Sequence, residues 1–214
     1  MMDLVGLARR VSDKEVDRDE FAKAALGDER IRDEIVRLMV TDRRIMVYYH
    51  CYEIAAAASR ERPELFHRYW DDIAPLLHHE NSYHRDIALT LLANLAVADA
   101  GGRLAEIFAA YAARIGDEKF MTALCCVRNL GRIAACLPAR RDEITQLLLD
   151  VDRRCRFPAK QKELLKCDVI EALEGFYESL SDMTPVDEFV RRAGKSISPK
   201  TKARAKRFEA EHGL

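Results

Sequence analysis

Large apolar residues recur along this chain at intervals of three and four, the spacing that places them on one face of an α-helix. Residues 29–40 illustrate it with Ile31, Ile35, Leu38 and Met39. No segment of useful length alternates apolar and polar residues, as a half-buried strand would. The pattern therefore predicts an all-α fold. The expected helices are two short ones within 3–26, split near Ser12, and then 29–40, 43–60, 63–79, 83–99, 103–115, 118–137, 141–155, 159–180, 186–195 and 199–211.

A short phrase recurs about every forty residues: an apolar residue, two small or polar residues, another apolar residue and then usually alanine. The second apolar residues of successive copies lie 41, 38 and 43 residues apart. Each copy falls late in a helical pattern that follows a shorter one, so the repeating unit is a pair of helices. Such pairs bury their apolar faces by stacking on their neighbours. The copies are Cys51–Ala55, Leu92–Ala96, Leu130–Ala134 and the weaker Leu173–Tyr177.

Residues that start helices stand where the pattern changes. Ser12 and Glu15 have the spacing of a capping box. Asn81 precedes one expected helix as a cap, and Ser198–Pro199 pairs a cap residue with proline at the first helical position. Only nine glycines and six prolines interrupt the chain. These features predict long helices with short connections and antiparallel neighbours.

The stretch Arg85–Ala96 resembles the second helix of a HEAT repeat: a basic residue near its start, then small and apolar residues, then Leu-small-x-Leu-Ala. Lys119–Ala134 is similar, and Ser198–Phe208 resembles the helix that often closes such arrays. Over residues 29–212 the chain thus resembles the HEAT-repeat and armadillo-like superfamily. The resemblance implies a right-handed α-solenoid of about four to five antiparallel helix pairs in one continuous array. Its parts would be N-terminal capping helices (1–28), HEAT-like repeats (29–182) and a basic C-terminal capping pair (183–214).

By this resemblance, the second helix of each pair would line a concave face where HEAT proteins usually bind partners. The register of helix 83–99 sends Ile87, Leu91, Leu92 and Leu95 inward and leaves the opposite stripe at the surface. Such stripes have a mixed, partly aromatic polar character, which suits a protein or peptide better than a phosphate backbone. The alternative is an ordinary solvated helix face. The predicted protein-binding residues are Tyr49, Glu53, Thr90, Asn94, Arg128, Arg132 and Glu171.

Basic residues are concentrated near the C-terminus. The net charge of the chain is −1, but residues 190–214 carry +6 and the remainder −7. On helix 199–211 the basic side chains form stripes that could contact phosphates or an acidic partner. The alternative is a solvated capping helix whose single aromatic residue, Phe208, docks on the repeats. The candidate contact residues are Lys200, Lys202, Arg204, Lys206 and Arg207.

No catalytic motif stands out. Six cysteines include no CxxC pair, which favours buried free thiols over a disulfide or zinc framework. His78, His79, Glu80 and His84 are the densest set of candidate metal ligands, but adjacent helical residues point about 100° apart, which favours a solvated turn. Cys125–Cys126 has no His or acid at helical spacing to act as a base. The sequence therefore predicts no catalytic residues, no metal and no cofactor.

These features favour a non-enzymatic scaffold or adaptor that binds a protein or peptide. The alternative is nucleic-acid binding, and its least favoured form is a relative of the HEAT-like alkylpurine DNA glycosylases, because the lone Trp70 falls on a first helix. Self-assembly is a third possibility. The longest apolar runs are far shorter than the roughly 20 residues of a membrane span. The N-terminus also lacks the order of a secretory signal, so we expect a cytoplasmic protein without membrane contact.

Overall fold

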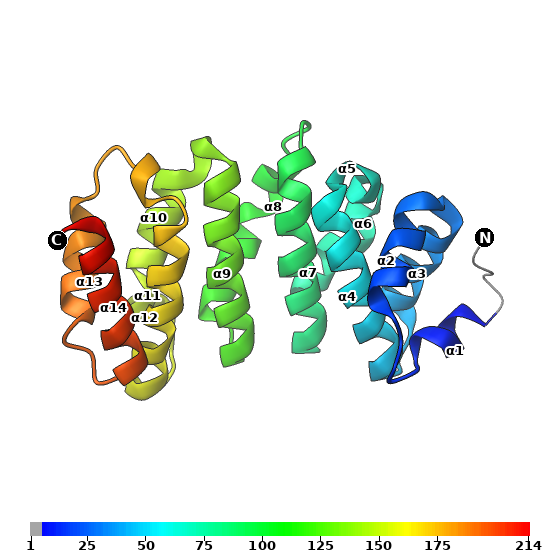
Figure 1. The fold of residues 1–214 in the computed structure, drawn as a ribbon, viewed down its shortest axis with the longest axis horizontal. Helices are drawn as coiled ribbons and strands as arrows, with labels where there is room; N and C mark the ends of the chain where they lie inside the picture. The colour runs from blue at the N-terminus through cyan, green and yellow to red at the C-terminus, as the bar shows by residue number, and fades with distance from the viewer. Residues whose placement is uncertain (1–5) are drawn as a thin grey trace. The chain divides into compact units, whose positions relative to one another are not determined.

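Every regular element in the described part of the chain is helical, which confirms the all-α prediction. The computed structural model describes residues 6–214 (Figure 1). They divide into two compact units, of which the first ends at Leu104 and the second runs from Ala105 to Leu214. None of their helices combines the length and apolarity needed to cross a membrane. The predicted division into two caps and a repeat region stays a prediction.

The first unit is built around α4 (Ile45–Glu61) and α7 (Ser82–Leu95). α4 packs against α2 (Arg18–Gly27), α3 (Glu29–Thr41) and α7, and Figure 1 shows α2, α3 and α4 side by side. α7 also contacts the short helices that lead into it. The other elements of this unit are α1 (Leu7–Val11), α5 (Pro63–Phe66), η1 (His67–Tyr69), α6 (Trp70–Ile73), η2 (Ala74–His78) and η3 (Ala96–Ala98).

The second unit is built around α9 (Phe120–Cys136), α12 (Ala159–Glu174) and α14 (Pro199–His212). α12 contacts both α9 and α14, and α13 (Thr184–Ala193) packs against α12 and α14 (Figure 1). The boundary between the two units falls inside α8 (Arg103–Ala112). The remaining elements are η4 (Ala113–Gly116), η5 (Pro138–Arg140), α10 (Arg141–Leu149), α11 (Val151–Arg154) and η6 (Tyr177–Ser179).

The repeated phrase supplies core residues to both units. Its first, fourth and fifth positions are 4 % exposed or less in all four copies, including the weak copy that ends at Tyr177. Full burial of a large apolar side chain stabilises a fold by roughly 1.5–3 kcal/mol, so these positions are a main source of stability. The four residues of α7 that the register sends inward are also buried, as predicted: Ile87, Leu91, Leu92 and Leu95.

Several segments predicted as single helices are broken. Residues 159–180, for example, leave the α-helix after Glu174 and end in η6. Residues 63–79 alternate between α-helix and 3-10 helix, with Pro75 in the first turn of η2. Proline has no backbone N–H and its ring clashes with the carbonyl four residues earlier, so an α-helix is interrupted there. Residues 141–155 divide at Asp150, whose ψ of 15° leaves the α-helical region.

The start of α2 also differs from the prediction. Asp17 is its cap and accepts a hydrogen bond from the Glu20 N–H at 2.9 Å. The hydroxyl of Ser12 instead donates to a carbonyl of α1, so the predicted capping box is wrong. The caps predicted at Asn81 and Ser198 are confirmed, since each accepts a hydrogen bond from a backbone N–H in the following turn.

Gly131 allows α9 and α12 to approach closely. A Cβ atom at this position would lie 2.7 Å from the Cβ and 2.8 Å from the Cα of Ala172. Contacts this short force either helix to shift, and well-packed cores resist such shifts. Gly131 is the second residue of the third phrase, where the second copy has Ala93. The small residue in this copy is therefore required by helix packing.

Replacing Gly131 by alanine should lower the free energy of unfolding by about 1–3 kcal/mol, because it overpacks the contact between α9 and α12. Urea denaturation measures this change. Gly27→Ala is the matched control, since nothing lies within 4 Å of its added Cβ. If the two variants unfold at the same urea concentration, the close approach at Gly131 is not a constraint on the fold.

Candidate protein-binding surface

Exposed apolar side chains gather at the N-terminal ends of α4 and α7. The ring centroid of Tyr49 lies 5.7 Å from that of Tyr52 and 6.3 Å from that of Tyr83. Ile45 and Met46 precede Tyr49 by four and three residues and so share its side of the helix. Ile45 is 61 % exposed and Tyr83 51 %. These five residues are termed the aromatic patch. Tyr49 is one of the predicted protein-binding residues, and Tyr52 belongs with Tyr48 and Tyr49 to a tyrosine run that the sequence also offers as a candidate recognition patch.

The residues that the prediction missed have one signal in common. Ile45, Met46 and Tyr83 fall in the first turn of an expected helix, outside the positions that the core needs. Tyr48, next to Tyr49 in sequence, points the other way and is 2 % exposed. It follows that the tyrosine run of α4 is shared between core and surface.

The aromatic patch has an acidic border. Glu53 follows Tyr49 by one helical turn and forms an ion pair with Arg18 of α2 at 2.6 Å. Arg18 also donates to Nε2 of the buried His50, whose Nδ1 donates to a carbonyl at the end of α1. Partial burial raises the pKa of Tyr49, and the charges of Glu53 and Asp86 raise it further. The Tyr49 hydroxyl thus stays protonated at neutral pH, beside two carboxylates.

Thr90 and Asn94 do not lie on an exposed stripe. They are 8 % and 3 % exposed, because α7 packs against α4 on this side. The Asn94 amide donates to the Ala56 carbonyl at 3.1 Å and to the Ser59 hydroxyl at 2.8 Å. Tyr52 donates to the Thr90 hydroxyl at 3.3 Å. The expectation that Thr90 and Asn94 face solvent is corrected, whereas Tyr49 is exposed and Glu53 half-exposed.

The two arginines predicted to bind a partner lie on α9 within the second unit. Arg128 binds the buried carboxylate of Asp168 on α12, through Nε at 2.8 Å and Nη2 at 2.7 Å. Arg132 donates to the side-chain carbonyl of Asn129 at 2.7 Å. Sequence reasoning missed Asp168, although an acid between buried Cys167 and Val169 signals a buried charge that needs a partner. The guanidinium of Arg128 remains half-exposed.

Glu171 and the basic helix α14 were predicted as separate sites, and the structure brings them together. Arg204 is close to Glu171 at 3.9 Å and forms an ion pair with Glu174. Arg207 pairs with Glu211 on its own helix at 2.8 Å. Arg204 is therefore mostly committed to the fold. Three basic residues of α14 are exposed and have no ion-pair partner within residues 6–214: Lys200, Lys202 and Lys206.

The six cysteines, all within the described residues, are free thiols. Burial raises the pKa of Cys51 to about 12 and that of Cys155 and Cys167 to about 11. A thiol with such a pKa is protonated at neutral pH and reacts poorly. The expectation of buried thiols fails for Cys136, which is exposed at the last position of α9, and Cys125 is half-buried.

Trp70 is enclosed within the first unit. It is 2 % exposed, its ring lies 5.4 Å from the ring of His67, and the Arg103 guanidinium lies 5.4 Å from its centroid. It therefore cannot stack on a nucleotide base without unpacking. No three His, Cys, Asp or Glu side chains between residues 6 and 214 are placed to hold a metal ion together.

Comparisons with known proteins give a fold likeness alone. No protein-family model matches the chain. No curated protein matches its sequence either. Among solved structures, a chain described as an engineered protein of the Northeast Structural Genomics Consortium matches with a TM-score of 0.50 and 17 % sequence identity, covering 97 % of this chain and 95 % of that chain. At this identity, the likeness transfers no residue roles.

His84 follows Tyr83 of the aromatic patch in α7. It is 6 % exposed, and its ring centroid lies 4.2 Å from His79 and 4.7 Å from Tyr48. Burial, and secondly the neighbouring His79, lower the pKa of His84 below its ordinary value of 6.5. Protonation of this imidazole is therefore less favourable in the folded chain than in the unfolded one.

The free energy of unfolding should accordingly fall as the pH drops below about 6.5, because the unfolded state then binds the proton that the folded state resists. Urea denaturation at about pH 7.5 and 5.5 should show a larger loss for the native chain than for His84→Gln. His78→Gln, at an exposed position, is the control and should keep the native pH dependence. An unchanged pH dependence in His84→Gln would exclude His84 as its source.

Proposed function

We propose that this chain is a HEAT-like, right-handed α-solenoid that acts as a non-enzymatic scaffold and binds a protein or peptide partner. Two observations support the repeat architecture. The phrase occupies buried positions in all four copies, and adjacent long helices such as α3 and α4 pack as a pair. Burial raises the pKa of Cys51, Cys155 and Cys167, which argues against these three thiols as nucleophiles. The proposed role is therefore recognition.

The aromatic patch carries the proposal. Contiguous exposed apolar side chains on a folded surface often mark interaction sites. Tyrosine is enriched among the residues that contribute most to binding, since it offers a large, rigid contact area together with a hydroxyl donor. Tyr49 and Tyr83 combine these properties with an edge-to-face contact that fixes their relative orientation. A partner side chain could bury against both rings and Met46 at little ordering cost.

The charge around the patch defines the partner further. Burial raises the pKa of the Tyr49 phenol, and the nearby carboxylates of Glu53 and Asp86 raise it further. A phosphate backbone would be repelled by these acids. The proposed partner is a protein segment with an aliphatic or aromatic anchor and neutral or basic flanking residues. The acids also favour a basic flanking residue through a cation–π contact with Tyr49.

Nucleic-acid binding through α14 is the second candidate. The exposed lysines at 200, 202 and 206 support it, because cations without internal partners are available to phosphates. The ion pair with Glu174 removes the mostly buried Arg204 from the stripe, whereas Arg207 stays exposed beside Glu211. The second candidate therefore rests on fewer cations than the sequence indicates.

A random peptide library displayed on phage and selected on the full chain tests the leading proposal. Selected peptides should share an apolar anchor with neutral or basic neighbours. Their affinity, measured by fluorescence anisotropy, should fall at least tenfold for Tyr49→Ala/Tyr83→Ala, because loss of two central tyrosines costs about 2 kcal/mol or more. Circular dichroism verifies that the variant remains folded.

Val97→Ala is the matched control, since it removes a 59 % exposed apolar side chain that follows the far end of α7. It should bind like the native chain. An equal loss for Val97→Ala, or selection of peptides without an apolar anchor, would remove the aromatic patch as the binding site. Binding of an oligonucleotide that disappears in Lys200→Glu/Lys202→Glu/Lys206→Glu would favour the second candidate instead.

A further inference from the structure

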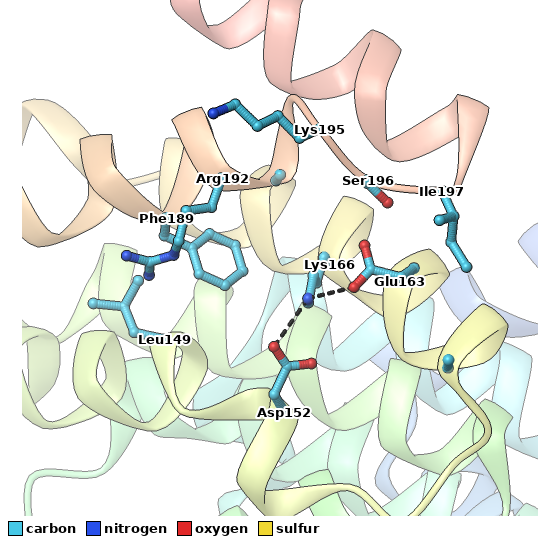
Figure 2. A pocket seen from close by; sticks show the side chains of 11 residues that line it. Leu149, Asp152, Glu163, Lys166, Phe189, Arg192, Lys195, Ser196 and Ile197 are labelled. Atoms are coloured by element: carbon cyan, nitrogen blue, oxygen red, sulfur yellow. Dashed lines mark hydrogen bonds and ion pairs between the residues drawn. The ribbon is translucent and has the colours of Figure 1, made fainter.

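A separate pocket of about 450 Å³ lies in the second unit, within the size range of ligand pockets. It is bordered by α10, α11, α12, α13 and the connection between α13 and α14. Figure 2 shows Lys166 at its centre, Phe189 and Leu149 on one side, and Ser196 and Ile197 on the other. None of these residues belongs to the aromatic patch or to the predicted protein-binding residues.

The floor of the pocket is a compact charge cluster. Lys166 forms ion pairs with Asp152 at 2.9 Å and with Glu163 at 2.5 Å (Figure 2). Burial disfavours its charge, but the hydrogen bonds to Glu163 and Asp152 outweigh burial and raise the pKa of Lys166. Burial raises the pKa of Glu163, but Ser196 and Lys166 lower it below its ordinary value. Both carboxylates thus have a cation, and the ammonium keeps a third N–H beyond the two it uses.

The rim of the pocket holds cations that the fold does not neutralise. Arg192 lies at the end of α13, is largely exposed, and has only a long contact of 3.8 Å with the equally exposed Glu188. Lys195 is exposed and has no ion-pair partner within the described residues. A pair this exposed contributes little. The lining as a whole has three cations and two acids, and both acids form ion pairs with Lys166.

The walls between floor and rim are apolar. Phe189 and Leu149 form one wall, and Arg192 extends over it (Figure 2). On the other side, Ile197 is 68 % exposed, the highest value among the exposed large apolar residues of the described chain. An exposed isoleucine across the pocket from an apolar wall, with two unneutralised cations at the rim, is a poor arrangement for solvent and a good one for a ligand that is both apolar and anionic.

We infer that this pocket binds an acidic peptide segment in which one apolar side chain is flanked by aspartate or glutamate. The apolar side chain would bury against Phe189, Leu149 and Ile197, and the flanking carboxylates would meet Arg192 and Lys195 at the rim. This specificity is opposite in charge to that proposed for the aromatic patch. The chain would then hold two different segments, one in each unit.

Peptide selection on full-length Tyr49→Ala/Tyr83→Ala tests the pocket without a contribution from the aromatic patch. We expect peptides with an apolar residue between acidic residues to be enriched. Their dissociation constant, from fluorescence anisotropy, should rise about tenfold in Arg192→Glu/Lys195→Glu and also rise in Ile197→Ser. The dissociation constant should also increase with salt concentration, since salt screens the exposed charge pairs that hold the peptide.

Lys202→Glu/Lys206→Glu is the matched control, because it makes the same change in net charge at exposed positions of the same unit. It should alter the dissociation constant less than about twofold. The inference is overturned if no acidic, apolar consensus is enriched, or if the control weakens binding as much as Arg192→Glu/Lys195→Glu. It is also overturned if Ile197→Ser has no effect, since binding would then be unspecific attraction to positive charge. Because the tyrosines are absent, each result is independent of the aromatic patch.

Discussion

Exclusion of water from the faces between long helices is the constraint on which the rest of this structure depends. The burial of the phrase in every copy fixes which side of α4, α7, α9 and α12 points inward. The same burial determines which side chains stay exposed and can contact a partner. These lie beyond the packed part of a helix, in first turns such as Ile45–Met46 and in connections such as Lys195–Ile197. Both candidate surfaces are therefore located at helix ends.

Some polar groups inside the packed regions are tolerated because they have partners on a neighbouring helix. Asn94 bridges α7 to α4 through a carbonyl and a hydroxyl, and Asp168 is matched by Arg128 from the neighbouring helix. An unpaired amide or carboxylate in these places would cost more than a lost contact. Because the geometry of such pairs is directional, they specify the register between two helices, which apolar contacts alone leave looser.

The sequence was sufficient for the all-α class, for most helix positions and for the caps at Asn81 and Ser198, because these follow from local periodicity and local hydrogen bonding. It was insufficient for Thr90 and Asn94. Register on one helix gives the angle of a side chain but not how many neighbours surround the helix, and the polar side of α7 is covered as well.

The pocket was not predictable for a related reason. Leu149, Lys166, Phe189 and Ile197 come from four segments, and no spacing along the chain relates them. The aromatic patch was partly predictable. Its residues fall on two helices that the sequence could place, but their exposure depends on which parts of those helices are covered by neighbouring helices. Hydrophobic periodicity therefore locates cores better than it locates surfaces.

The packing of α14 shows that its basic residues have a structural role as well as a candidate binding role. Phe208 is fully buried against Tyr177, and Arg204 neutralises Glu174. The helix thus packs against α12 and neutralises an acidic side chain of α12, and it also presents exposed lysines. A chain cut before Pro199 would lose packing and uncover acids at the same time as it lost positive charge. A change in its binding would then reflect a newly exposed acidic surface as well as the loss of the basic helix.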